Sequence, residues 1–366
     1  MRVKYIYAMR NYLITGALGF IGSNFVNHLV TREAENEGAQ NCSHKEGGEL
    51  VPALEAPKPA ERSSPLRVVV LDKMDYCSSL SNIIPSEKVE IVIGKISNAE
   101  LVSYLLETFE IDTVVHFAAS THVDNSFLNS VSFSKNNIVG THVLLECCRM
   151  YQEKTGRLKK FLHISTDEVY GEVADGEIRT ENSILDPTNP YAASKAGAEF
   201  MVKSYLYSYK LPVIITRGNN VYGPRQYPEK VIPKFICQLL NGQRLTIHGT
   251  GKTKRNFIHV DDVVKAVDLI LSKGVVGQIY NISSCYDNEY TVMEIARMLV
   301  GLFHGEDEPV ENHLVFVEDR HFNDYRYCIS QDKLKELGWE PTKTDVRQNL
   351  IDLIKWYRER NPWPFP

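Results

Sequence analysis

The sequence predicts an α/β protein with a doubly wound parallel sheet and a smaller, mixed α/β lobe. Short runs of β-branched and aromatic residues alternate with longer helical patterns, which is typical of a parallel sheet with crossover helices. A glycine-rich turn follows the first run, and polar residues follow a later run at its carboxyl end. The expected strands are residues 12–15, 67–71, 89–93, 113–117, 161–165 and 213–216.

The regular alternation ends near Arg217, which divides the chain into a larger lobe, residues 1–217, and a mainly separate lobe, residues 218–366. The second part has a proline-rich loop at 224–233, a helix around 235–240, and another helix that opens at Asp261. Residues 278–282 resemble a strand that can return to the main sheet. Some segments of the second lobe are therefore expected to belong to the first.

Residues 34–65 interrupt the rhythm of the first lobe. The segment is rich in Glu, Gly, Ser, Pro and Ala and has no aromatic residue, so it has little with which to form a core. We predict a mobile surface insertion, with a regulatory or docking role as the alternative. A short extension is expected before the first strand.

The bulk properties exclude several classes of protein. The 366 residues carry a formal charge of -5, so no global basic field attracts nucleic acid or anionic membrane. No stretch approaches the roughly 18 apolar residues that a membrane span needs. The seven cysteines are scattered without a C-x-x-C spacing, which favours reduced thiols in the cytoplasm.

The first expected strand leads into Gly16-Ala17-Leu18-Gly19-Phe20-Ile21-Gly22 and then into an amphipathic helix. This order is the context of a Rossmann-type dinucleotide fingerprint. Glycines permit a tight turn and close backbone approach, and the helix N-terminus offers N–H donors to a pyrophosphate. Ordinary turns use glycine triplets too, so the motif needs a second observation.

Asp72 supplies that observation at the end of the second expected strand. The fingerprint requires an acid about 20 positions downstream to bind the ribose hydroxyls. Asp72 lies 50 positions after Gly22, and the 32-residue insertion accounts for all but 18 of them. An acid at this place favours NAD over NADP, although an aspartate at a strand end can also be a simple turn residue.

Later strand ends carry further candidates. Ala118 and Ala119 follow the fourth expected strand and leave room for a close cofactor contact, whereas His116 is expected to be structural. Asn189-Pro190 predicts a helix start that places Tyr191 and Lys195 on one helical face. A free phenol has a pKa near 10, and we expect Lys195 and a nicotinamide ring to favour the phenolate.

The most discriminating motif is Ser165-Thr166-Asp167-Glu168-Val169-Tyr170-Gly171 at the end of the fifth expected strand. An adjacent acid and base can divide proton donation and proton removal, as an elimination of water requires. The same Asp-Glu pair on a surface turn would only be solvated. Its position in a parallel sheet, where ligands bind at carboxyl ends, favours catalysis.

These motifs together resemble the extended short-chain dehydrogenase/reductase superfamily, and within it the nucleotide-sugar 4,6-dehydratase family of dTDP-glucose 4,6-dehydratase type. The resemblance runs from Tyr12 to the last helix. It implies NAD as cofactor, a nucleoside-diphosphate glucose as substrate, a substrate-binding second lobe and a homodimer. Ile96 is a further cofactor contact that it implies.

The resemblance also implies roles in a cycle in which NAD is reduced and reoxidised. Tyr191, with Lys195, removes the C4 hydroxyl proton while hydride moves to NAD, and Thr166 hydrogen-bonds the C4 oxygen. Glu168 then removes the C5 proton and Asp167 protonates the departing C6 hydroxyl. Hydride then returns to C6 as a proton returns to C5, which leaves a 4-keto-6-deoxy sugar.

Substrate contacts follow from two further matching segments and one arginine. Asn220 and Lys230 lie in the loop that resembles the family's segment beneath the diphosphate, and Arg255 matches a diphosphate-binding arginine whose paired donors suit phosphate. Arg320 and Asn323 lie in the late segment that closes over the substrate. Each could instead be a surface residue, and pairing of Asp319 or Asp324 with nearby arginines is an alternative for the late segment.

Two other functions use the same scaffold. One is a nucleotide-sugar epimerase or decarboxylase, from which loss of water in the product would distinguish a dehydratase. The other is a non-catalytic NAD-binding regulatory protein, against which the intact set of Thr166, Tyr191 and Lys195 argues. Thymine and uracil differ by one methyl group, worth about 1 to 3 kcal/mol in an apolar pocket, so the nucleotide stays open.

Overall fold

The computed structural model describes residues 11–42, 65–284, 286–320 and 322–360. Its centre is a seven-stranded parallel sheet in the order β10-β6-β5-β4-β1-β2-β3. The strands are β1 Asn11–Thr15, β2 Arg67–Asp72, β3 Val89–Ile93, β4 Thr113–His116, β5 Lys160–Thr166, β6 Val213–Gly218 and β10 Ile279–Ile282. This architecture confirms the predicted doubly wound sheet.

The order of the strands reverses between β1 and β4, so a crevice opens at the carboxyl ends of these two strands. The glycine turn follows β1, and Ala118 lies two residues beyond the end of β4. The two predicted cofactor segments therefore meet at the point where such sheets bind ligands.

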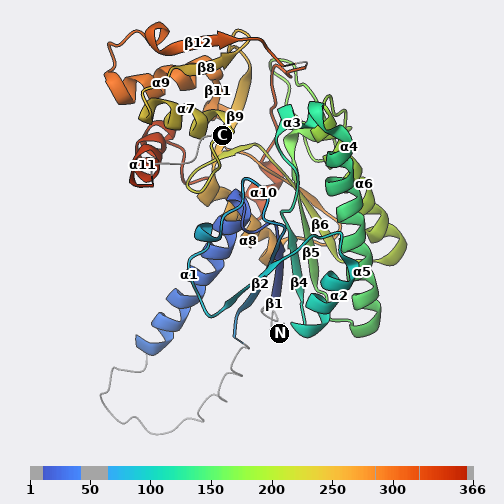
Figure 1. Cartoon of the computed structure of the whole chain (residues 1–366). Helices are drawn as coiled ribbons and strands as arrows, with labels where there is room; N and C mark the ends of the chain where they lie inside the picture. Colours follow the sequence, from blue (N-terminus) through green and yellow to red (C-terminus); the bar gives the residue numbers. More distant parts are fainter. Residues whose placement is uncertain (1–10, 43–64, 285, 321, 361–366) are drawn as a thin grey trace.

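Helices cover both faces of the sheet (Figure 1). One face is covered by α1 (Phe20–Cys42) and α8 (Val260–Lys273), which share a core with the sheet. On the other face α2 (Ala99–Thr108), α5 (Gly140–Thr155) and α6 (Pro190–Tyr209) form a second core. In the described part of the chain, no helix combines the length and apolarity that a membrane crossing requires.

Helix α1 corrects one boundary predicted from the sequence. The helix continues to Cys42, so residues 34–42 are helical and do not belong to the insertion expected at 34–65. The rest of that segment, 43–64, and the expected N-terminal extension lie outside the described residues.

The smaller lobe has its own core around two small sheets (Figure 1). β7 (Asn220–Tyr222) and β11 (Glu289–Thr291) flank β9 (Lys254–His259), in parallel and antiparallel pairing respectively, while β8 (Leu245–His248) pairs with β12 (Leu314–Val317). Their helices are α7 (Val231–Leu240), α9 (Val292–His304) and α11 (Val346–Glu359). Helix α7 starts at Val231 and accommodates Pro233 in its first turn, so the proline-rich loop is shorter than expected.

Segments of the second half return to the main sheet. β10, expected at 278–282, pairs in parallel with β6, and the short helix α10 (Asp332–Glu336) packs beside it. The two lobes thus share elements from distant parts of the chain. This sharing holds the smaller lobe against the carboxyl end of the sheet.

Candidate active site

The glycine turn after β1 packs directly on the chain that follows β4. Gly16 has a φ of +69°, and a Cβ on it would lie 2.6 Å from the Cα of Ala118. Only glycine fits such a position without strain. Gly19 is different, because its Cβ would meet only the Gly16 carbonyl oxygen, at 3.3 Å, among the described residues. The turn therefore has an open side above Gly19.

Helix α1 begins at Phe20, which places the backbone N–H groups of Phe20, Ile21 and Gly22 in its first turn. First-turn N–H groups have no partner within their own helix. The predicted pyrophosphate donors therefore lie together beside the open side of the glycine turn. Ile96 is buried and close to Gly140, while Ala119 is half-buried next to Ala118.

Asp72 joins the end of β2 to the glycine turn. One carboxylate oxygen accepts a hydrogen bond from the Leu18 N–H at 3.0 Å, and the other accepts from the Met74 N–H and the Ser78 hydroxyl at 2.9 and 3.1 Å. The side chain is 5% exposed. It lies where a ribose acid is expected and also organises the loop that surrounds that place.

The carboxyl pair follows β5 in a short 3-10 turn, η3 (Asp167–Tyr170), for which Thr166 is the N-cap. The turn lies against the start of α6, because Asn189 caps that helix and also contacts the pair. Its side-chain oxygen accepts from the Ala192 N–H at 2.9 Å, and its amide donates to Glu168 Oε2 at 3.2 Å. The helix start and the carboxyl pair are thereby fixed together.

Asp167 is almost fully buried, whereas Glu168 is partly exposed. Burial, and then the charge of Glu168, raise the pKa of Asp167 to about 7. Asn219 and Thr166 donate hydrogen bonds to its two oxygens at 2.8 and 3.2 Å. A carboxyl with this pKa retains a proton in a sizeable fraction of molecules at neutral pH, as a general acid requires.

Burial also raises the pKa of Glu168, and the positive charges of Lys230 and Arg255 act in the opposite direction. These two basic residues come from the smaller lobe. The charges of two predicted substrate residues therefore act on a member of the predicted catalytic pair.

Tyr191 and Lys195 lie on the buried face of α6, 7% and 4% exposed. Lys195 Nζ donates to the Ile164 carbonyl at 2.7 Å, and burial lowers its pKa to about 8. Burial and the charges of Glu168 and Asp167 raise the pKa of Tyr191, which only a hydrogen bond with Thr166 opposes. These groups of the chain hold Tyr191 as a phenol, and the expectation that Lys195 and a nicotinamide ring together favour the phenolate stays a prediction.

Two histidines near the site are structural, as their environments show. His116 lies between the hydroxyls of Thr15 and Thr141, at 2.7 and 2.8 Å, and burial lowers its pKa to about 3. His122 caps α3 (Val123–Leu128) by accepting from the Asn125 N–H.

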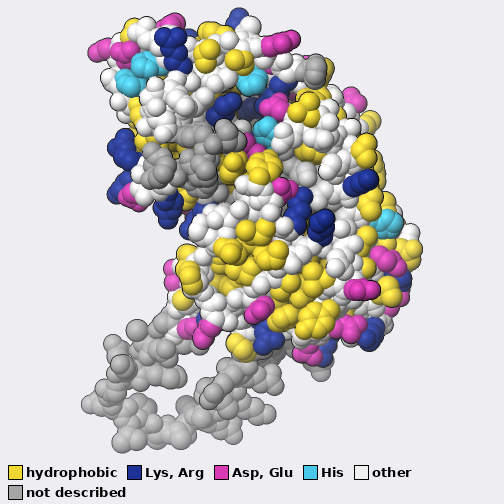
Figure 2. Space-filling view, in the orientation of Figure 1, with side chains coloured by type: hydrophobic (Ala, Val, Ile, Leu, Met, Phe, Trp, Pro, Cys, Tyr) yellow, Lys and Arg dark blue, Asp and Glu magenta, His cyan; other side chains and the backbone are white. Residues whose placement is uncertain are grey.

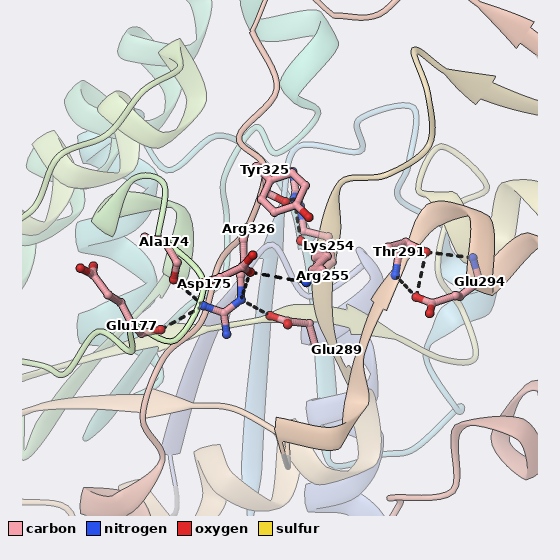
Figure 3. Close-up of polar contacts among 10 residues, drawn as sticks. All are labelled: Ala174, Asp175, Glu177, Lys254, Arg255, Glu289, Thr291, Glu294, Tyr325 and Arg326. Carbon is pink, nitrogen blue, oxygen red and sulfur yellow. Dashed lines mark hydrogen bonds and ion pairs between the residues drawn. The ribbon is translucent and has the colours of Figure 1, made fainter.

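Arg255 and Asn323 are brought together, as Arg255 Nη2 donates to Asn323 Oδ1 at 3.2 Å. The guanidinium also lies 4.7 Å from the ring centre of Tyr327. Figure 3 shows how the late segment is held beside β9 and β11, with Arg326 bound to Glu289 and to the Ala174 and Glu177 carbonyls. Arg255 is therefore presented from a rigid surface.

Lys230 and Arg320 reach across to the first lobe. Lys230 Nζ donates to the Thr121 carbonyl at 2.9 Å, and Arg320 pairs with Asp124, with Nε and Oδ1 2.7 Å apart. The alternative, in which Asp319 or Asp324 pairs with a nearby arginine, is not the arrangement in the described residues: Asp324 accepts from the hydroxyls of Thr188 and Tyr327, and Asp319 accepts from the Asn323 amide. Asn220, in β7, is half-buried. All five predicted substrate residues are only partly buried.

The sequence reasoning missed three residues that contact the catalytic pair or its surroundings. Asn219 donates a hydrogen bond to Asp167, and Asn189 donates one to Glu168. The ring of Tyr327 stacks on Arg255. Asn219 directly follows β6, so its position at a strand end was the available signal. The other two depend on contacts between distant segments.

Comparisons with known proteins agree with this site. Residues 60–350 match the family model described as GDP-mannose 4,6 dehydratase. The chain is 46% identical, over 98% of its length, to an Arabidopsis thaliana trifunctional UDP-glucose 4,6-dehydratase/UDP-4-keto-6-deoxy-D-glucose 3,5-epimerase/UDP-4-keto-L-rhamnose-reductase, of which it covers 48%. It therefore spans about half the length of that relative. It is 40% identical, over 96% of its length, to a Homo sapiens dTDP-D-glucose 4,6-dehydratase, of which it covers 90%.

Solved structures show the same relationship. The crystal structure of a dTDP-glucose 4,6-dehydratase from Streptomyces venezuelae with NAD bound is 35% identical, with a TM-score of 0.81 over 96% of this chain and 98% of that one. A UDP-glucose 4-epimerase from Thermotoga maritima is 27% identical, with a TM-score of 0.78 over 96% of this chain and 99% of that one. The family match and the two dehydratase relatives establish that this chain belongs to the nucleotide-sugar 4,6-dehydratase family of the extended short-chain dehydrogenase/reductase superfamily.

Proposed function

We propose that this protein removes water from a nucleoside-diphosphate glucose, UDP-linked or dTDP-linked, and releases the 4-keto-6-deoxy sugar. The observation that supports this most directly is the adjacent pair Asp167 and Glu168, held beside Tyr191 at the end of β5. An epimerase on this fold needs no such acid and base. The dehydratase relatives described above agree with the proposal.

The crevice residues fit NAD. The open side of Gly19 allows close approach of the cofactor, and the first turn of α1 supplies N–H donors for its pyrophosphate. Buried Asp72 supplies the acid that a dinucleotide needs beyond them. NAD bound here would supply the chemistry of hydride transfer, from sugar C4 at the start and to C6 at the end as a proton returns to C5, and its positively charged ring would favour the Tyr191 phenolate. Gly16, Gly22, Ile96, Ala118 and Ala119 would line its path.

Tyr191 is the base for the C4 hydroxyl in this proposal, and Thr166 orients the C4 oxygen. Lys195 ties the helix that carries Tyr191 to β5 through its hydrogen bond to the Ile164 carbonyl, and it contributes positive charge. Once C4 is a ketone, the C5 hydrogen is acidic. Glu168 takes that proton, while Asp167 gives its proton to the C6 hydroxyl, which leaves as water.

The substrate's charged part would lie against the smaller lobe. Arg255 offers a planar pair of donors for a phosphate, and Lys230 and Arg320 add positive charge at the junction of the lobes. Asn220 and Asn323 would complete the contacts. The charges of Lys230 and Arg255 lower the pKa of Glu168, which supports a diphosphate site on the side of Glu168 that belongs to the smaller lobe.

We also propose a homodimer that works in the cytoplasm. The face of α6 that points away from the core carries exposed Phe200 and Tyr207, and α5 exposes Met150 nearby. Four small residues near the start of α6, at positions 192, 193, 196 and 197, are divided between the two sides: Ala192 and Ala196 are buried in the protein's own interior and Gly197 lies against Ile138, whereas Ala193 is exposed. The five cysteines whose side chains the structure describes, at 77, 147, 148, 237 and 328, are free thiols, which agrees with a reducing compartment.

The test is to incubate the purified protein with UDP-glucose or dTDP-glucose and to analyse the product by mass spectrometry. We expect a product lighter by one water, and a preference for one nucleotide identifies the base. Unchanged mass with altered configuration at C4 would show an epimerase. No conversion of either sugar would refute the proposal.

A further inference from the structure

A buried ion pair connects β6 with helix α6. Arg217 and Glu199 are 1% and 0% exposed, and Arg217 Nη2 lies 2.6 Å from Glu199 Oε2. Arg217 Nε donates to both carboxylate oxygens at 3.0 and 3.2 Å. Glu199 lies one helical turn beyond Lys195, so the pair is attached to the helix that carries the catalytic tyrosine and lysine.

The same guanidinium reaches the turn that carries the carboxyl pair. Arg217 Nη1 donates to the Tyr170 hydroxyl at 2.7 Å, and the guanidinium carbon lies 4.7 Å from the centre of the Tyr170 ring. The Tyr170 hydroxyl donates in turn to Asn281 Oδ1 in β10, at 2.8 Å. Tyr170 is 2% exposed and follows Glu168 by two residues in η3.

Arg217 thus lies between α6 and η3, the two elements that carry the proposed catalytic residues, and strand pairing does not join these two elements directly. It sits in β6, opposite Ser165 of β5 on one side and Asn281 of β10 on the other. A buried ion pair is expensive to desolvate and often adds nothing to stability over apolar residues of the same size. Its use here is therefore better explained by geometry than by stability.

We propose that Arg217 is a positioning residue that sets the carboxyl pair in register with Tyr191 and Lys195. The inference rests on the proposed dehydration. Oxidation at C4 depends on α6, and removal of water depends on η3. Both must address neighbouring carbons of one sugar, so a loose connection between the two elements would let oxidation proceed while elimination lags.

Glu199 also connects Arg217 electrostatically with Lys195. Its charge opposes the effect of burial on the pKa of Lys195. Arg217 fixes both oxygens of this carboxylate and so keeps the charge at a constant distance from Lys195. The positioning residue therefore contacts no reacting atom but determines the surroundings of groups that do.

Tyr170→Phe tests the proposal with one lost hydroxyl, because it removes the hydrogen bonds of Tyr170 with Arg217 and Asn281 and leaves the ring contact and the Arg217–Glu199 pair in place. Tyr12→Phe is the matched control. Tyr12 is also 2% exposed, and its hydroxyl interacts with Arg32, which pairs with Asp268 far from the carboxyl edge of the sheet. Arg217→Lys, which keeps the charge without the fork, is a second variant.

Three quantities are measured for each purified variant: the thermal midpoint, the rate of dehydration, and the share of bound cofactor found reduced during turnover. For Tyr170→Phe we expect dehydration to slow about tenfold, because small displacements near reacting atoms are costly. The KM should stay unchanged and the reduced share should rise. Arg217→Lys should behave likewise, while Tyr12→Phe changes only the thermal midpoint.

Equal slowing of oxidation and elimination in Tyr170→Phe, with no rise in reduced cofactor, would overturn the proposal and leave the network a purely structural one. So would an unchanged rate in both Tyr170→Phe and Arg217→Lys. Failure of the proposed function is a separate outcome, since the unaltered protein would then release no dehydrated sugar.

Discussion

At the scale of single residues, the two adjacent carboxyls of the site, Asp167 and Glu168, have different surroundings. Asp167 is enclosed and receives hydrogen bonds from Asn219 and Thr166, while Glu168 is nearer to solvent and to the basic residues of the smaller lobe. Both have raised pKa values through burial. The sequence predicted the pair and its strand end, but not the partners that distinguish its members, because those lie at 189 and 219.

The raised pKa of Asp167 also makes a prediction for stability. Its pKa is about 7 in the folded protein and about 3.9 in an unfolded chain. Between these values the folded state binds more protons, so the contribution of Asp167 to stability falls as the pH rises from about 4 to about 7. We expect Asp167→Asn to gain stability relative to the unaltered protein across this window.

Denaturant unfolding of both proteins at pH 5 and pH 8 measures this difference. The buried histidines are present in both proteins, so their own pH dependence cancels in the comparison. A gap that does not widen towards pH 8 would contradict the raised pKa. The same variant should lose dehydration, because an amide cannot supply the proton.

At the scale of elements, the regular parts of the fold were predictable and the unusual parts were not. The six expected strands are present within two residues of their predicted ends. The end of α1 was missed because the composition of 34–42 was read together with the following segment, although its Glu, Ala and Gln favour helix. The π-helical stretch η2 (Ser134–Val139) has no recognisable sequence signal.

Asn189 both caps helix α6 and contacts Glu168. Two substitutions should separate these two roles. Serine is also a good N-cap, so Asn189→Ser should keep the cap of α6 but lose the contact with Glu168. Asn189→Ala should lose both, at a cost of about 1 kcal/mol in unfolding free energy.

The contact with Glu168 lowers that carboxyl's pKa, so either change should raise it. The ascending side of the pH–rate profile, which needs ionised Glu168, should move to higher pH in both variants. Only Asn189→Ala should unfold more readily. A profile that moves only in Asn189→Ala would assign the effect to the cap and not to the contact.

At the scale of the whole molecule, the candidate substrate residues lie where two lobes meet, and their contacts join residues far apart in sequence. Arg320 and Asp124 are 196 positions apart, and Lys230 and Thr121 are 109 apart. Motifs predicted that both sides carry functional residues. They could not predict which side chains pair, since pairing depends on how the smaller lobe is held by β10 and α10.

The outer face of the first lobe leads to a prediction about assembly. Phe200 and Tyr207 are 59% and 70% exposed and lie on one side of α6, and Figure 2 shows hydrophobic side chains along the edge where this helix lies in Figure 1. A face of this kind is typical of an interface between copies. In a two-fold dimer the same patch meets itself, so a charge placed there opposes an identical charge.

Phe200→Glu combined with Tyr207→Glu should therefore convert a dimer into a monomer, as measured by light scattering after gel filtration. Phe316→Glu alters an equally exposed aromatic residue, 58%, on β12 of the other lobe and should leave the mass unchanged. A dimeric mass that survives the double substitution would place the interface elsewhere, and a monomeric unaltered protein would refute the dimer itself.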